Sequence, residues 1–171
     1  MLHKYGVISV FCAALFSVPQ LTQAATLDKD DIQFMKMAAE TSMTEAHLGQ
    51  MAEARAGRQD VKDFGKKLST DHTSAYEELS VLANKTGDTI PKAIGRDTTI
   101  DRLVHLKGNS FDRAFAQDEV QSHKTAIAAF KKEGDHGENP DVKAWAKKMI
   151  PTLEGHLETA EKLAMVEKKA R

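Results

Sequence analysis

Residues 61–82 read VKDFGKKLSTDHTSAYEELSVL and carry the clearest helical pattern in the chain. Apolar or small side chains, with one histidine among them, recur at intervals of three and four residues, which is the period of one helix face. This face comprises Val61, Phe64, Leu68, His72, Ala75, Leu79 and Leu82. The pattern predicts a helix over residues 59–85 that ends before Gly87 and buries this face.

Three further stretches show the same period, at residues 28–56, 110–133 and 140–168. No comparable stretch alternates with the period of two that a half-buried strand requires. Asn139 and Pro140 fit the cap and the first position of the last helix. The predicted fold class is therefore all-α.

An internal repeat relates the second and fourth helices. The sequence VKDFGKKL at residues 61–68 aligns with VKAWAKKM at residues 142–149, at a constant offset of 81 positions. Short loops make each pair of helices antiparallel, whereas the connection over residues 86–109 is long enough to run along a bundle of about 40 Å. We therefore expect a single domain over residues 25–171: a ferritin-like four-helix bundle made of two helical hairpins joined by a long crossover connection.

The N-terminus has the pattern of a secretory signal peptide. Residues 1–24 combine Lys4 near the start with an apolar run over residues 7–18 and small residues after it. This run is shorter than the ~20 residues that a membrane-spanning helix needs. We expect export to the periplasm, no membrane span, and a mature chain that begins at Ala25 or Thr26.

The charge pattern does not suggest a nucleic-acid partner. The 24 basic and 25 acidic side chains nearly balance, and lysine pairs such as Lys66 and Lys67 are interleaved with acids, without aromatic neighbours to stack bases. The partners left to consider are an envelope protein or a second copy of this chain. The sequence identifies neither.

Four polar residues on the inward faces lie near mid-height of the predicted helices: Glu45, His72, His123 and His156. Their heights agree to within ~3 Å at the helical rise per residue, so three imidazoles and a carboxylate can meet in one layer. Such a set suits one divalent transition metal, with imidazole favouring Zn, Cu, Fe or Ni. Two other interpretations stay open: a structural layer satisfied by hydrogen bonds, and a site for an organic ligand or a proton.

The spacing around these residues favours a protein that is not an enzyme, without deciding the question. Di-iron bundles carry Glu-x-x-His on two helices. Here Glu119 lies four residues before His123, and Glu154 lies two before His156. Ferroxidase or oxygenase chemistry is therefore disfavoured, and no catalytic residue is predicted.

Weaker candidates surround this layer. Pro151 predicts a bend one turn before His156, which either curves the helix around the core or opens room for a ligand. The methionines of the first helix are expected to pack in the core rather than to bind Cu(I) through their thioethers. They are Met35, Met37, Met43 and Met51. Three histidines lie outside the inward faces and are expected at the surface rather than in a binding site. They are His47, His105 and His136.

Motifs along nearly the whole mature chain resemble the bacterial domain of unknown function 4142 family. The motifs are Phe34, Ala38-Ala39, Glu45, Leu48-Gly49, Asp71-His72, Phe111-Asp112, His123 and Ile150-Pro151-x-Leu153-x-x-His156. The resemblance implies an exported ferritin-like bundle, often labelled an outer membrane protein, and it implies no activity. Ser122 departs from the acidic residue that the family commonly has before the histidine of the third helix.

The sequence leads us to expect an exported helical-bundle protein with a non-enzymatic binding or stress-related role in the envelope. One alternative is a bundle that binds a divalent transition metal through its histidine and glutamate layer. The other is an envelope interaction module that uses its charged outer face. Selective metal uptake that depends on the inner histidines separates these alternatives.

Overall fold

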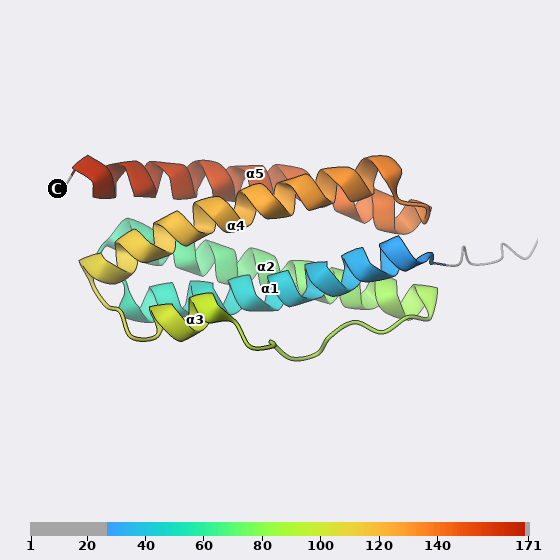
Figure 1. Cartoon of the computed structure of the whole chain (residues 1–171), viewed down its shortest axis with the longest axis horizontal. Coiled ribbons are helices and arrows are strands. Elements are labelled where there is room, and N and C mark those ends of the chain that lie inside the picture. Colours follow the sequence, from blue (N-terminus) through green and yellow to red (C-terminus); the bar gives the residue numbers. More distant parts are fainter. Residues whose placement is uncertain (1–26, 170–171) are drawn as a thin grey trace, which may run out of the picture.

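The computed structural model describes residues 27–169, which form four long helices and one short helix (Figure 1). The helices are α1 (Lys29–Arg55), α2 (Gln59–Thr86), α3 (Thr98–Leu103), α4 (Asn109–His136) and α5 (Pro140–Lys169). No strand occurs in this part of the chain, and none of its helices is long and apolar enough to cross a membrane. The all-α prediction is confirmed, and each long helix begins and ends within three residues of its expected position. The predicted signal peptide and mature start lie outside the described residues.

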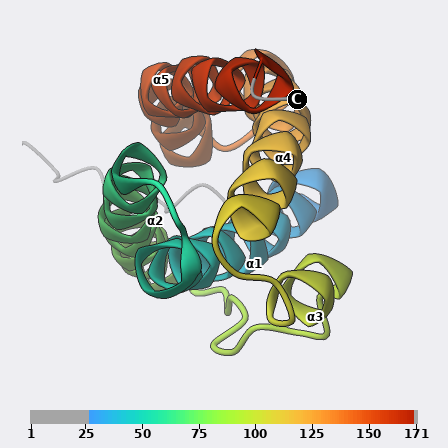
Figure 2. The same ribbon diagram turned by 90° about the vertical axis from the view of Figure 1, so that its left-hand side faces the viewer.

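The four long helices form a bundle of two antiparallel hairpins, α1 with α2 and α4 with α5 (Figure 1). The connection over residues 87–108, which includes α3, returns along the length of the bundle, so that α2 and α4 run in the same direction. Viewed along its axis, the bundle places α2 beside α5 and α1 beside α4 (Figure 2). This is the predicted ferritin-like connectivity.

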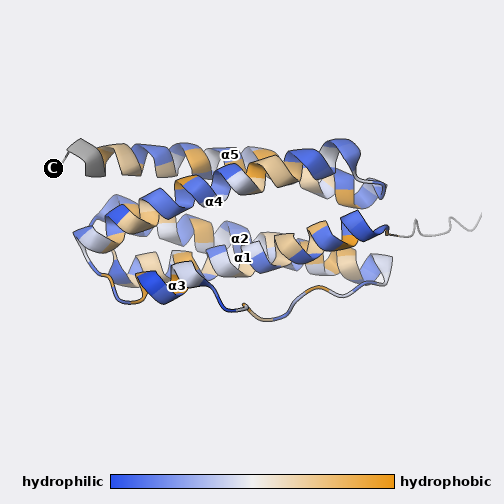
Figure 3. Ribbon diagram, viewed as in Figure 1, coloured by the Kyte–Doolittle hydropathy of each residue, from blue (hydrophilic) through white to orange (hydrophobic). Residues whose placement is uncertain are grey.

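The helices bury their apolar faces in two clusters, one toward each end of the bundle. One cluster contains Phe34, Phe130 and Trp145, whose rings pack edge-to-face or tilted. The other contains Phe64 and Phe115. Each long helix carries hydrophobic and hydrophilic residues side by side along its length, as amphipathic helices do (Figure 3). The level between the two clusters holds the polar residues singled out above.

Two glycines allow α1 and α2 to approach each other closely. A Cβ atom at Gly49 would lie 2.4 Å from the carbonyl oxygen of Gly65, and one at Gly65 would lie 2.6 Å from the Cβ of Ala52. Neither position accepts a side chain without a shift of the helix backbone. The first hairpin is therefore tightly packed along this stretch.

Two buried aspartates dock the hairpins on each other. Asp31, at the start of α1, accepts hydrogen bonds of 3.1 and 2.9 Å from the backbone N–H groups of residues 138 and 139, in the turn before α5. Asp112, at the start of α4, accepts two bonds of 3.0 Å from residues 57 and 58, in the turn before α2. Both carboxylates are fully buried. The two contacts obey the same offset as the sequence repeat, so the internal repeat corresponds to a pseudo-twofold arrangement.

Candidate metal centre

Three histidines meet in the polar level of the bundle. His72 on α2, His123 on α4 and His156 on α5 are 3%, 1% and 0% exposed, and their ring centroids lie 5.2 to 5.7 Å apart. One nitrogen from each ring lies within 4.8 Å of the other two. The structure thus brings together three of the four residues that the sequence singled out.

Hydrogen bonds on the outer side of this cluster fix two of the rings. His156 Nε2 lies 2.8 Å from Oδ2 of Asp71, which also accepts a bond of 2.7 Å from Lys67. Although partial burial acts to raise the pKa of Asp71, the bonds from Lys67 and His156 outweigh it and lower that pKa, so the carboxylate is ionised. His156 therefore carries its proton on Nε2, and its Nδ1 faces the cluster with a lone pair.

The same reasoning assigns the tautomer of His123. Its Nδ1 lies 3.0 Å from the backbone carbonyl oxygen of Glu119, which can only accept. The proton of His123 is therefore on Nδ1, and Nε2 points a lone pair toward Nδ1 of His156 at 3.3 Å. Two lone pairs at this distance repel each other unless a cation lies between them.

His72 adds a buried nitrogen, Nε2, that has no hydrogen-bond partner among the described residues. Burial, together with the other two imidazoles, lowers the pKa of His72 to about 3, and burial lowers the pKa of His156 to about 4 despite the bond to Asp71. Both rings are neutral at pH 7, which is the form that ligates a metal.

The distance of 3.3 Å between His123 Nε2 and His156 Nδ1 also fits two nitrogens bound to one metal ion. Two nitrogens that each lie about 2.0–2.1 Å from one tetrahedral ion are separated by about 3.3–3.4 Å. His123 Nε2 and His156 Nδ1 already have this separation. Donation of the second ring N–H to a carboxylate or a backbone carbonyl is the usual outer contact of a metal-bound histidine.

Glu45 lies beside His123 rather than within the histidine cluster. It faces Glu119, and the ligand atoms of Glu45, Glu119 and His123 all lie within 4.8 Å of one another. Both carboxyl groups are buried, at 2% and 1% exposure. Ser122 Oγ donates a hydrogen bond to Glu45 Oε1. In the part of the chain that the structure describes, no donor group reaches Glu45 Oε2 or either carboxylate oxygen of Glu119, except that Glu119 Oε2 approaches His123 Nδ1 to 3.3 Å. The two carboxyl groups can therefore pair only with each other, through a shared proton.

Burial makes it costly to ionise both of these glutamates. It raises the pKa of Glu119 to about 7, and burial together with the charge of Glu119 raises the pKa of Glu45 well above its usual value. Glu119 is not among the site residues predicted from the sequence. Its spacing of four residues from His123 was the available signal, because residues i and i+4 share one helix face.

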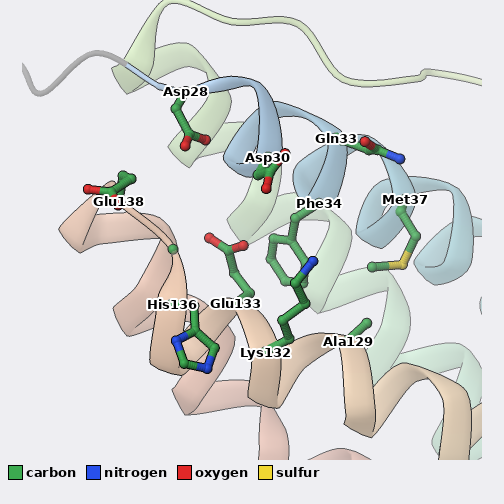
Figure 4. A pocket seen from close by; sticks show the side chains of 11 residues that line it. Asp28, Asp30, Gln33, Phe34, Met37, Ala129, Lys132, Glu133, His136 and Glu138 are labelled. Atoms are coloured by element: carbon green, nitrogen blue, oxygen red, sulfur yellow. The ribbon is translucent and has the colours of Figure 1, made fainter.

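The weaker candidates lie away from the histidine cluster. His136 lines a hollow of about 360 Å³ at one end of the bundle, together with Phe34 and the carboxylates of Asp28, Glu133 and Glu138 (Figure 4). The exposed His105 follows α3, and His47 lines a different hollow beside His72. The buried methionines of α1, Met35 and Met51, fill opposite apolar clusters. The helix α5 continues through Pro151.

The fold and the site together define a four-helix bundle with a buried layer of histidines and glutamates. Residues 16–163 match the family described as Domain of unknown function (DUF4142), and the chain belongs to this family. The resemblance noted from the motifs is thereby confirmed. No curated protein sequence matches the chain significantly.

Solved structures of low sequence identity share the fold. A crystal structure of a DUF305 fragment from Deinococcus radiodurans is 15% identical, with a TM-score of 0.72 over 82% of this chain and 98% of that one. CopM in the Cu(II)-bound form is 15% identical, with a TM-score of 0.69 over 79% and 95%. CopM in the Ag-bound form is 16% identical, with a TM-score of 0.65 over 77% and 93%.

Proposed function

We propose that this protein binds a divalent transition metal, with copper(II) preferred, through His72, His123 and His156. The observation that carries the proposal is the convergence of three buried imidazoles whose facing nitrogens lack partners in the described part of the chain. His123 and His156 each hold a proton on the outer nitrogen, which has an acceptor, so their inner nitrogens face each other without a donor. Nε2 of His72 has no hydrogen-bond partner among the described residues. A cation in the middle of the cluster supplies what these nitrogens lack.

A proton is a poor substitute for the metal. A shared proton would make one ring cationic, and the low pKa values of His72 and His156, caused mainly by burial, oppose this at pH 7. A purely structural layer would be expected to satisfy its buried polar atoms internally, because each unpaired one costs about 1–3 kcal/mol. This layer leaves several unpaired.

The preference for copper rests on ligand chemistry and on the structural neighbours. Imidazole ligands suit Cu(II), Zn(II) and Ni(II). The separation of 3.3 Å between His123 Nε2 and His156 Nδ1 is that of a tetrahedral ion, which is the usual geometry of Zn(II). The preference for copper therefore rests on affinity, because among the divalent first-row ions Cu(II) binds most tightly to a given nitrogen site. CopM, which shares this fold, was solved in Cu(II)-bound, Cu(I)-bound and Ag-bound forms. The signal-like residues 1–24 fit an exported, periplasmic protein. We infer a binding role, because the feature that the structure offers is a set of imidazoles whose nitrogens suit an ion.

The internal repeat provides substitutions for a test. At the offset of 81 positions, Leu153 corresponds to His72 and Ser42 corresponds to His123. The variants His72→Leu and His123→Ser therefore introduce side chains that the same fold already buries at equivalent positions. His105→Ala removes an exposed histidine and serves as the matched control.

The test is calorimetric titration of the metal-free mature protein with Cu(II), Zn(II) and Ni(II). We expect one tight Cu(II) site per chain, unchanged in His105→Ala and weakened at least about 100-fold in His72→Leu and in His123→Ser, because second-coordination-sphere losses alone already cost about 10–100-fold. Equal affinity in all four proteins would place the metal elsewhere and overturn the proposal.

A further inference from the structure

Three carboxylate oxygens next to the histidine cluster remain unexplained by a single bound metal. They are Oε2 of Glu45 and both carboxylate oxygens of Glu119, which are buried and, among residues 27–169, can pair only through a proton that the two carboxyl groups share. The two carboxyl groups belong to α1 and α4, which lie side by side. His123 lies between this pair and the other two histidines.

We propose that Glu45 and Glu119 hold a second divalent cation, one that favours oxygen ligands, beside the histidine-bound metal. The inference rests on the proposed function only in that His123 is shared by the two positions. Two carboxylates and one divalent ion sum to zero charge, which removes the cost of burying two ionised groups together. When the cation binds, the proton that the pair holds is released to solvent.

The ligand chemistry separates the two positions. The Nδ1 proton of His123 points at the carbonyl of Glu119, so this side of the ring offers a hydrogen bond rather than a lone pair. Oxygen atoms therefore dominate the second position, and such sets suit Mn(II) or Mg(II), whereas imidazole sets suit Cu(II) or Zn(II). The two positions are expected to take different ions from a mixture.

Surface hollows reach the carboxylate pair from the side of the connection that carries α3. One hollow of about 230 Å³ is lined by Glu45 and Glu119 together with Asp97 and Asp118. A second hollow, of about 300 Å³, also reaches Glu45 and is lined by Glu40 and Asp97, with Arg96 as the opposing charge. Carboxylates at the mouth raise the local concentration of cations, so this face provides an access route to the layer.

The test is Mn(II) binding, followed by the loss of the free-ion signal in electron paramagnetic resonance, for the metal-free and the Cu(II)-loaded protein. We expect about one Mn(II) per chain, weakened at least tenfold in Glu119→Gln and in Glu45→Gln, while both variants retain the Cu(II) site. Glu133→Gln is the control, because Glu133 is another buried carboxyl group with a raised pKa that lies at the end of the bundle. Circular dichroism verifies that each variant is folded.

The two proposals fail in different ways. His72→Leu leaves the carboxylate pair untouched, so it should lose Cu(II) and keep Mn(II). Loss of Cu(II) in that variant, with no Mn(II) bound by the wild type or with equal Mn(II) binding in Glu119→Gln, would overturn the second position and leave the first intact. Mn(II) binding that depends on Glu119, without any Cu(II) site that depends on His72, would support the second position and overturn the proposed function.

Discussion

A buried imidazole needs a partner for each ring nitrogen, and His72 lacks one. Leucine occupies the equivalent position in the internal repeat, and the fold buries it without difficulty. His72 therefore costs free energy in the metal-free protein that an apolar residue would not cost. Under the proposed function, the metal that His72 binds offsets this cost.

This cost should depend on pH. In the unfolded chain His72 takes up a proton near pH 6.5, whereas burial lowers its pKa in the folded protein to about 3. Below pH 6.5 the unfolded state binds the additional proton, so wild-type stability falls as the pH falls toward 3. We therefore expect the free energy of unfolding of metal-free His72→Leu to rise relative to that of the wild type as the pH falls from 6.5 to 4.5. The difference should grow by at most about 1.4 kcal/mol per pH unit, measured by urea unfolding. If the difference in the free energy of unfolding between the two proteins stayed constant over this range, His72 would be protonated in the folded state.

Glu119→Gln should show the opposite trend. Burial raises the pKa of Glu119 from 4.5 to about 7, so the folded state holds a proton that the unfolded state releases between these values. The stability that this proton contributes is present below pH 4.5 and is lost as the pH rises through 7. The Gln side chain of the variant cannot ionise, so the free energy of unfolding of the variant should rise relative to that of the wild type as the pH rises from 4.5 to 7.5. Urea unfolding at the same series of pH values measures this difference. A relative stability of the variant that rises on acidification would contradict the raised pKa of Glu119.

At the level of helices, the period of apolar residues predicted most of the structure. The inward face read from residues 61–82 is buried at every position, because one helix face suffices to define it. The long connection predicted that α2 and α4 run in the same direction. The contact of Asp31 with residues 138 and 139 was not predicted, because it joins positions more than one hundred residues apart. The Asp-x-x-Phe pattern that recurs at residues 31–34 and 112–115 was the available signal.

The two docking aspartates should contribute similarly to stability. Each is buried and accepts two backbone N–H bonds from the turn of the other hairpin. Asn in place of Asp keeps the shape but turns an N–H₂ group toward one of the donors. We expect Asp31→Asn and Asp112→Asn each to lower the free energy of unfolding by about 1.5–3 kcal/mol. The exposed Asp30→Asn is the control, within about 0.5 kcal/mol of the wild type.

Denaturant unfolding of the three variants measures these differences. Similar losses in the two buried variants would support the pseudo-twofold docking. If one of them matched Asp30→Asn, the docking contact at that end would be dispensable, and the symmetry would be one of sequence alone.

For the whole molecule, the proposed metal position joins the two hairpins. His72 comes from the first hairpin, and His123 and His156 come from the second. A metal that binds the folded state alone stabilises it by about 2.7 kcal/mol at 100 times Kd, which for a domain of this size raises Tm by about 5–10 °C. We expect this rise with Cu(II) in a thermal scan of the wild type and of His105→Ala, and none in the double variant His72→Leu/His123→Ser. An equal rise in the double variant would show that the ion acts at the surface.

The sequence sufficed to predict which helices bring their histidines to one level. It did not predict how the rings are oriented. Equal heights along four helices bring His72, His123 and His156 together because the bundle is regular. The direction of each ring nitrogen depends on partners from other helices, such as Asp71 for His156. In the sequence, Asp71 is the neighbour of His72, and only the packed structure shows that it bonds a different histidine.

X-ray absorption at the copper edge tests the central claim most directly, with one equivalent of Cu(II) on the metal-free protein. We expect three imidazole nitrogens at about 2.0 Å from the copper, with the multiple-scattering signature of the rings, and two or fewer in His72→Leu. A coordination sphere made mainly of oxygen, or one that is unchanged in His72→Leu, would contradict it.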